Sequence, residues 1–517
     1  MRFRGLAPLA ALTALAVLST GCTSSGTGSA AAAGTATPQP GASGRDWSVQ
    51  AENARPGDPH WRITHRGHLY DMEGYADRTD VEPGTSFRLY VNTDAPTFTV
   101  HAFRMGWYHG DGARDVWSSP PTPGTRQPAA TLDQPGSLIQ TRWRPSITVD
   151  TASWPPGSYL LRLDASTGPQ SYVPFVIRTP DVAGKIVLIS AVTSYEAYNG
   201  WGRYSLYGGP GGSFGSRARR VTFDRPISYG DGSGAYFQLE YPLVRFAEQL
   251  GLNLGYQTSI DLDLDPHALE GASAAVSEAH DEYWSVQMRE TLTRARDHGT
   301  NIAFFGANAI FRKIRFERSG LGQDRIEVNY KNAAEDPLFG KDNAQVTGNW
   351  PIAPDADPEQ SLIGQSYVCS VTANYPMLVT DPGSWIWKGV GLTAGEQLDG
   401  LVGPEFDQVN PSVPVPHPIE VVARSPVSCG APPTYSDVSY YTTAAGAGVF
   451  DAGTEDWVCA LPGAGCGGFT ASVLTQRAVT TATANILEAF GAGPAGHQHP
   501  AIELIPPTTR PSLLGTY

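Results

Sequence analysis

The chain has 517 residues, of which 41% are hydrophobic and 17% charged, so it has enough apolar side chains for sizeable buried cores. Its formal net charge of −14 at pH 7, its pI near 5.2 and the lack of a basic stripe argue against a nucleic-acid partner. The length predicts two domains.

The N-terminus has the pattern of an export signal. Two arginines precede an apolar stretch at residues 6–18 that is too short to span a bilayer comfortably. A Ser-Thr-Gly-Cys ending is typical of a bacterial lipoprotein, so residues 1–22 are expected to be a signal peptide with the lipid on Cys22. Residues 23–45 are rich in Ser, Gly, Ala and Thr and predict a flexible linker. We therefore expect an exported protein, either anchored to the membrane or extracellular.

Residues 46–180 predict a β-sandwich of the immunoglobulin-like type. Polar and apolar residues alternate at 87–91 and 159–163, between Pro-Gly turns, as in short antiparallel strands. The aromatic segment 103–110 is interpreted as a packed hairpin or a contact with the second domain. A ligand-binding role for it is the less favoured alternative.

Residues 181–492 predict an α/β domain, and 493–517 an irregular tail. The apolar runs 185–191, 273–279 and 301–305 have the length of buried strands, and amphipathic helical stripes lie between them. Alternating strands and helices predict a doubly wound, mostly parallel sheet of the amidotransferase or flavodoxin-like type.

Polar and aromatic clusters follow these three apolar runs, at 193–202, 280–285 and 306–308. The carboxyl ends of parallel strands meet at one edge of a sheet, where ligands bind. We therefore expect the candidate site at this edge, with the His-Asp-Glu-Tyr-Trp-Ser segment 280–285 at its centre.

Several familiar chemistries are excluded or disfavoured. The sequence has no G-x-S-x-G elbow, and His280, Asp281 and Ser285 are too close together to form a persuasive triad. The Gly-rich segment 208–213 lacks the Lys-Ser/Thr of a phosphate loop. No cysteine follows Cys22 until the last third of the chain, which excludes a thiol nucleophile in the predicted sheet.

The last third contains an even set of four cysteines. In an exported protein this pattern favours two disulfides, Cys459–Cys466 and Cys369–Cys429. A four-cysteine zinc site is the alternative, and it is disfavoured because there is no C-x-x-C pair.

Ordered motifs in this chain resemble the large (beta) subunit of N,N-dimethylformamidase. The resemblance covers the whole predicted α/β domain, and the signatures at 74–75 and 104–108 resemble the sandwich that often precedes it. The motifs lie at residues 194–202, 205–207, 223–226, 240–246, 280–285, 304–308 and 315–317.

The resemblance implies an amidohydrolase with one Fe(III) per chain, held by two tyrosines and a glutamate. By motif these fall on Tyr241, Tyr283 and Glu359; family members can carry a histidine two positions before the glutamate, where this chain has Asp357. Phenolate and carboxylate oxygens are hard anionic donors that suit ferric iron, and open positions on the ion would activate water.

Further roles are assigned around this implied centre. His280, Glu282 and Glu405 are the candidate acid–base groups that orient the water or protonate the leaving amine. Five other residues are expected to form pocket walls or to donate to the ligands: Tyr195, Tyr198, Asn199, Trp201 and Asn308.

Three functions remain open. The first is an exported iron-dependent hydrolase of a small amide or a related C–N bond. The second is a cell-surface module that binds glycan or peptide without turnover, and the third is a structural domain of the cell envelope. Iron content separates the first from the others. A small helper subunit or a homo-oligomer is compatible with all three.

Overall fold

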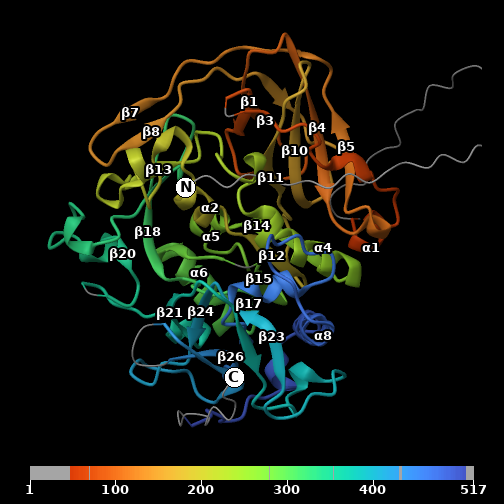
Figure 1. Cartoon of the computed structure of the whole chain (residues 1–517), viewed down its shortest axis with the longest axis vertical. Coiled ribbons are helices and arrows are strands. Elements are labelled where there is room, and N and C mark those ends of the chain that lie inside the picture. The colour runs from red at the N-terminus through yellow and green to blue at the C-terminus, as the bar shows by residue number, and fades with distance from the viewer. Residues whose placement is uncertain (1–46, 69, 279, 353, 430–433, 508–517) are drawn as a thin grey trace, which may run out of the picture. The chain divides into compact units, whose positions relative to one another are not determined.

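The computed structural model describes residues 47–68, 70–278, 280–352, 354–429 and 434–507 (Figure 1). The predicted signal peptide, the lipid site Cys22 and the whole predicted linker lie outside the described residues, as does the end of the predicted tail. Within the described residues, none of the helices combines the length and the apolar character that crossing a membrane requires.

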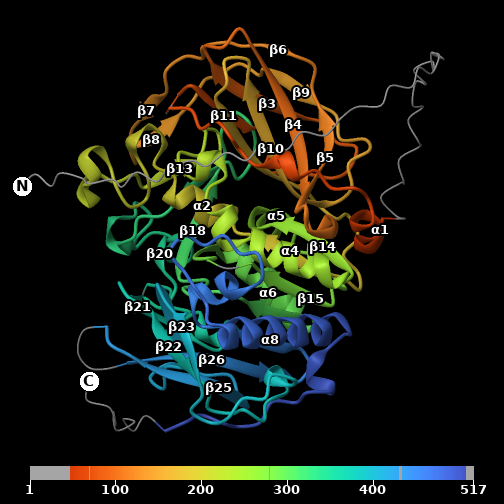
Figure 2. The same cartoon turned by 45° about the vertical axis from the view of Figure 1, so that its right-hand side comes forward.

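The N-terminal region is rich in strands and consistent with a sandwich (Figure 2). Two sheets share one apolar cluster that includes the fully buried Leu89, Val100 and Leu161. One sheet has the order β1 (Met72–Ala76), β3 (Phe87–Thr93), β9 (Ile147–Val149). The other has the order β2 (Asp80–Val81), β11 (Gln170–Ile177), β10 (Gly157–Ala165), β4 (Thr97–Met105), β5 (Ala113–Ser118), with β6 (Thr122–Pro123) beside β4.

The largest sheet in the described part has seven strands. Their order is β14 (Leu254–Thr258), β12 (Ile186–Ser190), β15 (Ala274–Ser277), β17 (Asn301–Phe304), β27 (Gly448–Asp451), β26 (Thr434–Thr442), β25 (Ile419–Val427). The first five are parallel, and the last two pair antiparallel. Three predicted apolar runs are confirmed as β12, β15 and β17.

The two predicted helical stripes are confirmed as α4 (Tyr241–Leu250) and α6 (Val286–Asp297). Ser285 caps α6 by accepting a hydrogen bond from the Met288 amide at 3.1 Å. Beyond the helix, Gly299 has a φ of +100°, a left-handed conformation that glycine adopts without strain. Segment 280–285 therefore joins strand β15 to helix α6, as predicted.

The predicted fold class is wrong. Strands account for 30% of the chain and helices for 23%, in many small mixed or antiparallel sheets and not in a doubly wound parallel sheet. Each parallel connection in a doubly wound fold needs a crossover, usually a helix. Between β17 and β27, however, the described residues contain a single α-helix, the short α7 (Gln360–Ile363). That stretch forms mostly short antiparallel strands.

Four smaller sheets complete the described strands. The five-stranded one contains β13 (Arg220–Thr222), β19 (Ile326–Val328), β18 (Arg312–Glu317), β16 (Tyr283–Ser285) and β20 (Gly348–Asn349). The two-stranded ones are β21 (Ser366–Ser370) with β24 (Glu405–Gln408), β22 (Tyr375–Leu378) with β23 (Gln397–Val402), and β7 (Thr131–Asp133) with β8 (Leu138–Gln140). The other α-helices are α1 (Val49–Asn53), α2 (Val192–Tyr198), α3 (Tyr236–Leu239), α5 (Ser259–Leu264) and α8 (Val473–Gly491).

Both predicted disulfides are confirmed. Cys369 on β21 bonds Cys429, and Cys459 on the 3-10 helix η10 (Glu455–Ala460) bonds Cys466, with Cα separations of 6.6 and 5.5 Å. Each therefore links a short element covalently to a second segment of the chain.

The aromatic segment 103–110 is packed, as interpreted from the sequence. Arg104 within it is fully buried and donates to Glu248 of α4 at 2.6 and 3.2 Å. This pair joins β4 of the N-terminal region to the helix beside the largest sheet. The predicted domain boundaries, with a limit near residue 180, stay predictions.

Candidate active site

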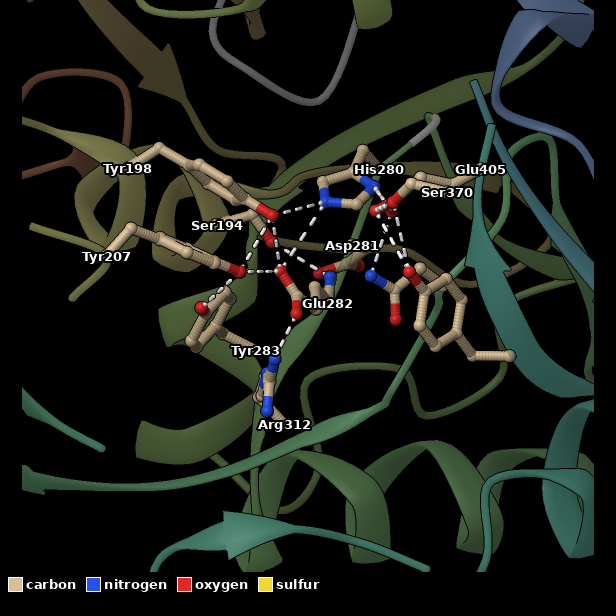
Figure 3. A network of polar contacts seen from close by, with 12 residues as sticks. Ser194, Tyr198, Tyr207, His280, Asp281, Glu282, Tyr283, Arg312, Ser370 and Glu405 are labelled. Atoms are coloured by element: carbon tan, nitrogen blue, oxygen red, sulfur yellow. Dashed lines mark hydrogen bonds and ion pairs between the residues drawn. The ribbon is translucent and has the colours of Figure 1, made fainter. Parts of the chain in front are cut away.

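The centre of the site is the turn from His280 to Glu282, between β15 and β16 (Figure 3). The amide of Glu282 donates to the Ser194 hydroxyl at 2.9 Å, and Ser277 donates to the Asp281 carboxylate at 3.1 Å. The side chains of His280 and Glu282 are 8% and 1% exposed. These two hydrogen bonds fix the turn, which holds two ionisable groups away from bulk water.

Two tyrosine hydroxyls converge on Glu282 (Figure 3). Tyr198, at the end of α2, and Tyr207 each donate to the same Glu282 oxygen at 2.7 Å, and their own oxygens lie 2.8 Å apart. The two rings stack with centroids 4.4 Å apart. The three oxygens therefore form a triangle with sides of 2.7 to 2.8 Å.

A second layer of side chains supports this triangle. Arg312 donates to the other oxygen of Glu282 at 2.9 Å, and Tyr283 donates to the Tyr207 hydroxyl at 2.7 Å. Lys331 contacts the Tyr283 hydroxyl, and its ammonium lies 3.4 Å from the centroid of the Tyr207 ring. Two basic side chains thus adjoin the triangle, and burial holds the pKa of Lys331 well below its usual range.

The charges around Glu282 shift several pKa values. Burial raises the pKa of the Tyr198 and Tyr207 hydroxyls, and the charge of Glu282 adds to the increase. Burial also raises the pKa of Glu282, but His280, Lys331 and Arg312 outweigh it and hold that pKa well below its usual range.

His280 is held between carboxylates. Its Nε2 lies 3.2 Å from the Tyr198 hydroxyl and 3.6 Å from Glu282, and its Nδ1 lies 3.6 Å from Glu405. Burial lowers the pKa of His280, yet the hydrogen bond to Glu282 and the charges of Glu455 and Glu405 raise it to about 10. These carboxylates therefore favour the protonated form of the imidazole.

A cavity of about 430 Å³ opens beside His280. Its polar lining includes Glu405, which accepts hydrogen bonds from Asn308 at 2.9 Å, Ser370 at 2.8 Å and Tyr367 at 3.3 Å. The full lining is Ser194, Tyr195, Tyr198, Tyr229, Ala235, Gln238, Leu239, His280, Ser370, Pro404, Glu405 and Glu455. Two of the three predicted acid–base residues, His280 and Glu405, therefore line this cavity, and the third, Glu282, lies 3.6 Å from the His280 ring nitrogen outside the lining.

The three predicted iron ligands lie in different surroundings. Tyr241 packs on Trp61 with ring centroids 5.5 Å apart and donates to the Gly112 carbonyl at 3.4 Å. Glu359 precedes α7 and accepts from the Tyr367 amide at 3.1 Å, whereas Tyr283 lies beside Tyr207. Among the described residues no contact joins Tyr241, Tyr283 and Glu359, so their binding of one ion stays a prediction without structural support.

Two of the five predicted pocket residues, Tyr195 and Tyr198, line the cavity, and Asn308 holds Glu405 in place. The other two have partners elsewhere. Asn199 donates to Glu196 at 3.0 Å and to the Pro226 carbonyl, and the Trp201 indole donates to Glu73 at 2.8 Å. None of these three partners lines the cavity.

Sequence reasoning missed four residues of the site: Tyr207, Arg312, Lys331 and Glu455. Tyr207 lies in the 205–207 motif that contributes to the family resemblance, so it had a usable signal. The other three had none, because no local pattern distinguishes them from surface charges.

The donor chemistry of the Tyr198, Tyr207 and Glu282 triangle fits the implied iron. It offers two phenol oxygens and one carboxylate oxygen, the same set of donor types that the resemblance implies. A cation among them would also offset the cost of ionising two buried phenols beside a carboxylate.

Comparison with known families supports this region as the functional part. A family model described as N,N-dimethylformamidase beta subunit-like, C-terminal, matches residues 99–468, more than two thirds of the chain. The matched range contains every residue that lines the cavity. No curated protein matches the chain.

Proposed function

The chain belongs to the N,N-dimethylformamidase beta subunit-like family, and on this premise we propose that it is an iron-dependent hydrolase of a small, non-peptide amide. Membership of a family of dimethylformamidase-like hydrolases implies hydrolysis of an amide C–N bond. The observation that carries the proposal is the triangle of Tyr198, Tyr207 and Glu282 oxygens next to the cavity beside His280.

In this proposal Tyr198, Tyr207 and Glu282 hold one ferric ion per chain, in place of the ligand set Tyr241, Tyr283 and Glu359 expected from motifs. When bound, the ion supplies Lewis-acid polarisation of an amide carbonyl and lowers the pKa of a coordinated water. Tyr283 and Arg312 orient Tyr207 and Glu282 through the hydrogen bonds that they donate.

Glu405 and His280 accept and donate protons in the proposed reaction. Glu405 faces the cavity in a fixed orientation, because Asn308 and Ser370 donate to it, and it is placed to accept a proton from an attacking water. His280 lines the same cavity between Glu282 and Glu405, and its role is to protonate the leaving amine.

Metal content tests the ligand assignment. Tyr207→Phe removes one donor oxygen but keeps the ring, and we expect it to abolish iron binding and the visible tyrosinate-to-iron absorption band. Tyr241→Phe is the matched control, since it also removes one tyrosine hydroxyl, here one that donates to the Gly112 carbonyl at 3.4 Å. Retention of iron in Tyr207→Phe with loss in Tyr241→Phe would restore the assignment made from motifs.

Turnover tests the function. Iron-loaded protein should hydrolyse formamides or similarly small amides, and Glu405→Gln should lower kcat while leaving the iron content unchanged. Full iron occupancy without turnover of any amide, together with tight binding of glycan or peptide, would favour a binding module.

Location and assembly are also proposals. The export signal and Cys22 support a lipid-anchored or extracellular enzyme. Cys22→Ser should release the protein from the membrane fraction, and unchanged membrane association would refute the anchor. Since the family is named for a beta subunit, a multi-subunit enzyme is expected, and co-purification of a small subunit would test it.

A further inference from the structure

One carboxylate in the cavity has no role in the proposed reaction. Glu455 begins the 3-10 helix η10 and lines the cavity together with His280 and Glu405. Single ligand atoms of these three residues lie within 4.8 Å of one another. Among the described residues the Glu455 carboxylate has neither a hydrogen bond nor an ion pair, whereas the Glu405 carboxylate accepts three hydrogen bonds.

The charges that line the cavity do not balance. Glu405 and Glu455 are the acidic groups of the lining, His280 is its one basic group, and no lysine or arginine belongs to it. His280 is already shared between Glu282 and Glu405, at 3.6 Å from each. Arg312 and Lys331 lie on the other side, against Glu282, Tyr207 and Tyr283. Among the described residues Glu455 therefore forms no ion pair of its own, and it shares the single charge of His280, which lies within 4.8 Å, with two other carboxylates.

The pKa of Glu455 agrees with this imbalance. Burial raises it, His280 opposes the increase, and the charges of Glu405 and Glu282 add to it. The ionised form of a carboxylate in such surroundings is stabilised by a cation that enters the cavity as part of a ligand.

The other walls suit an organic cation. Three tyrosines, Tyr195, Tyr198 and Tyr229, belong to the lining, and aromatic rings attract ammonium groups. A volume of about 430 Å³ is within the usual range for small-molecule sites. The ring of His280 lies between the Tyr198 hydroxyl and the two carboxylates, so the cation would sit a few bonds from the reacting carbonyl.

We infer that the substrate is a small amide that carries a positively charged amine or guanidine a few bonds from the scissile C–N bond, and that Glu455 binds this charge. The inference rests on the proposed amide hydrolase function and narrows its substrate class. A neutral amide such as a simple formamide would leave Glu455 unpaired and would be a poorer substrate.

Three probes of similar shape test the inference. N-(aminobutyl)acetamide is cationic, N-pentylacetamide is neutral and acetamidobutanoate is anionic. We expect iron-loaded, full-length protein to bind and hydrolyse them in that order, with at least a tenfold advantage in kcat/KM for the cation, the effect of roughly 1.4 kcal/mol. Glu455→Gln should lower the ratio of the two kcat/KM values, cationic over neutral, to about one, because the ratio cancels any effect of the substitution that both probes share.

The matched control is Glu290→Gln, which makes the same charge change on the exposed face of α6. Equal kcat/KM for the cationic and neutral probes would overturn the inference and leave the hydrolase function intact. If none of the probes is hydrolysed, calorimetry decides: binding of the cationic probe that Glu455→Gln abolishes supports the inference, and its absence overturns it. If Mn²⁺ displaces the cationic probe, and Glu455→Gln abolishes Mn²⁺ binding, the inference is overturned and the carboxylates are assigned to a metal site.

Discussion

Replacing Glu282 by glutamine tests the central carboxylate of the site. Glu282 is 1% exposed, and its two oxygens accept from Arg312 at 2.9 Å and from Tyr198 and Tyr207 at 2.7 Å. Removing one partner of a buried ion pair costs roughly 3–5 kcal/mol of folding free energy. Because Arg312 remains 18% exposed and bonded to Asn349, we expect a loss near the lower end, about 3 kcal/mol.

The assay is urea denaturation of iron-free protein, so that lost metal binding does not enter the comparison. The double variant Glu282→Gln, Arg312→Gln should lose less than the sum of the single losses, because the pair is coupled. Glu290→Gln, an exposed substitution of the same kind, should change the stability by less than about 0.5 kcal/mol. A loss below about 1 kcal/mol for Glu282→Gln would refute the view that Glu282 is a buried, paired carboxylate.

The remaining predictions concern stability away from the triangle. Burial raises the pKa of Glu359 to about 7, so the folded protein binds this proton more tightly than the unfolded chain, and stability falls as pH rises from about 4.5 to about 7. Glu359→Gln should therefore flatten the pH profile, and at pH 8 should unfold at higher urea than wild type; an unchanged profile would contradict the raised pKa. Glu248→Gln should cost about 3 to 5 kcal/mol because Arg104, fully buried, loses its charged partner, and a near-neutral result in the same denaturation assay would show that the pair is dispensable. Cys369→Ser should lower both thermal stability and kcat, since Cys369 precedes Ser370, which holds Glu405; a drop in stability with unchanged kcat would show that the disulfide does not support the site.

Local patterns predicted much of the architecture. The buried-strand runs became β12, β15 and β17, and the helix after residue 285 begins at a Ser cap and ends before Gly299. Such features depend on side chains a few positions apart, so a single sequence contains them. The cysteine pairs were also predictable, because an even set in an exported chain favours pairing.

The fold class was not predictable in the same way. The parallel order of β14, β12, β15, β17 and β27 follows the expected alternation of strands and helices, but the long stretch between β17 and β27 does not. This stretch is rich in Pro and Gly, and its strands carry too little periodicity to reveal whether they pair parallel or antiparallel. Pairing between strands is a non-local property, and here it produced several small antiparallel sheets.

For the site, the sequence by itself indicated segment 280–285 and the family, and it singled out His280, Glu282 and Glu405 as candidate acid–base residues, a role that stays a prediction. Only the tertiary structure decided which donors surround Glu282: Tyr198 and Tyr207 are 84 and 75 positions away in the chain, and they reach it because α2 and the loop after it pack beside β16. The tertiary structure also showed that Tyr241 packs against Trp61, without contact to Tyr283 or Glu359 among the described residues. The physical reason is that motifs record which residue types are present, whereas a ligand set depends on where distant side chains converge.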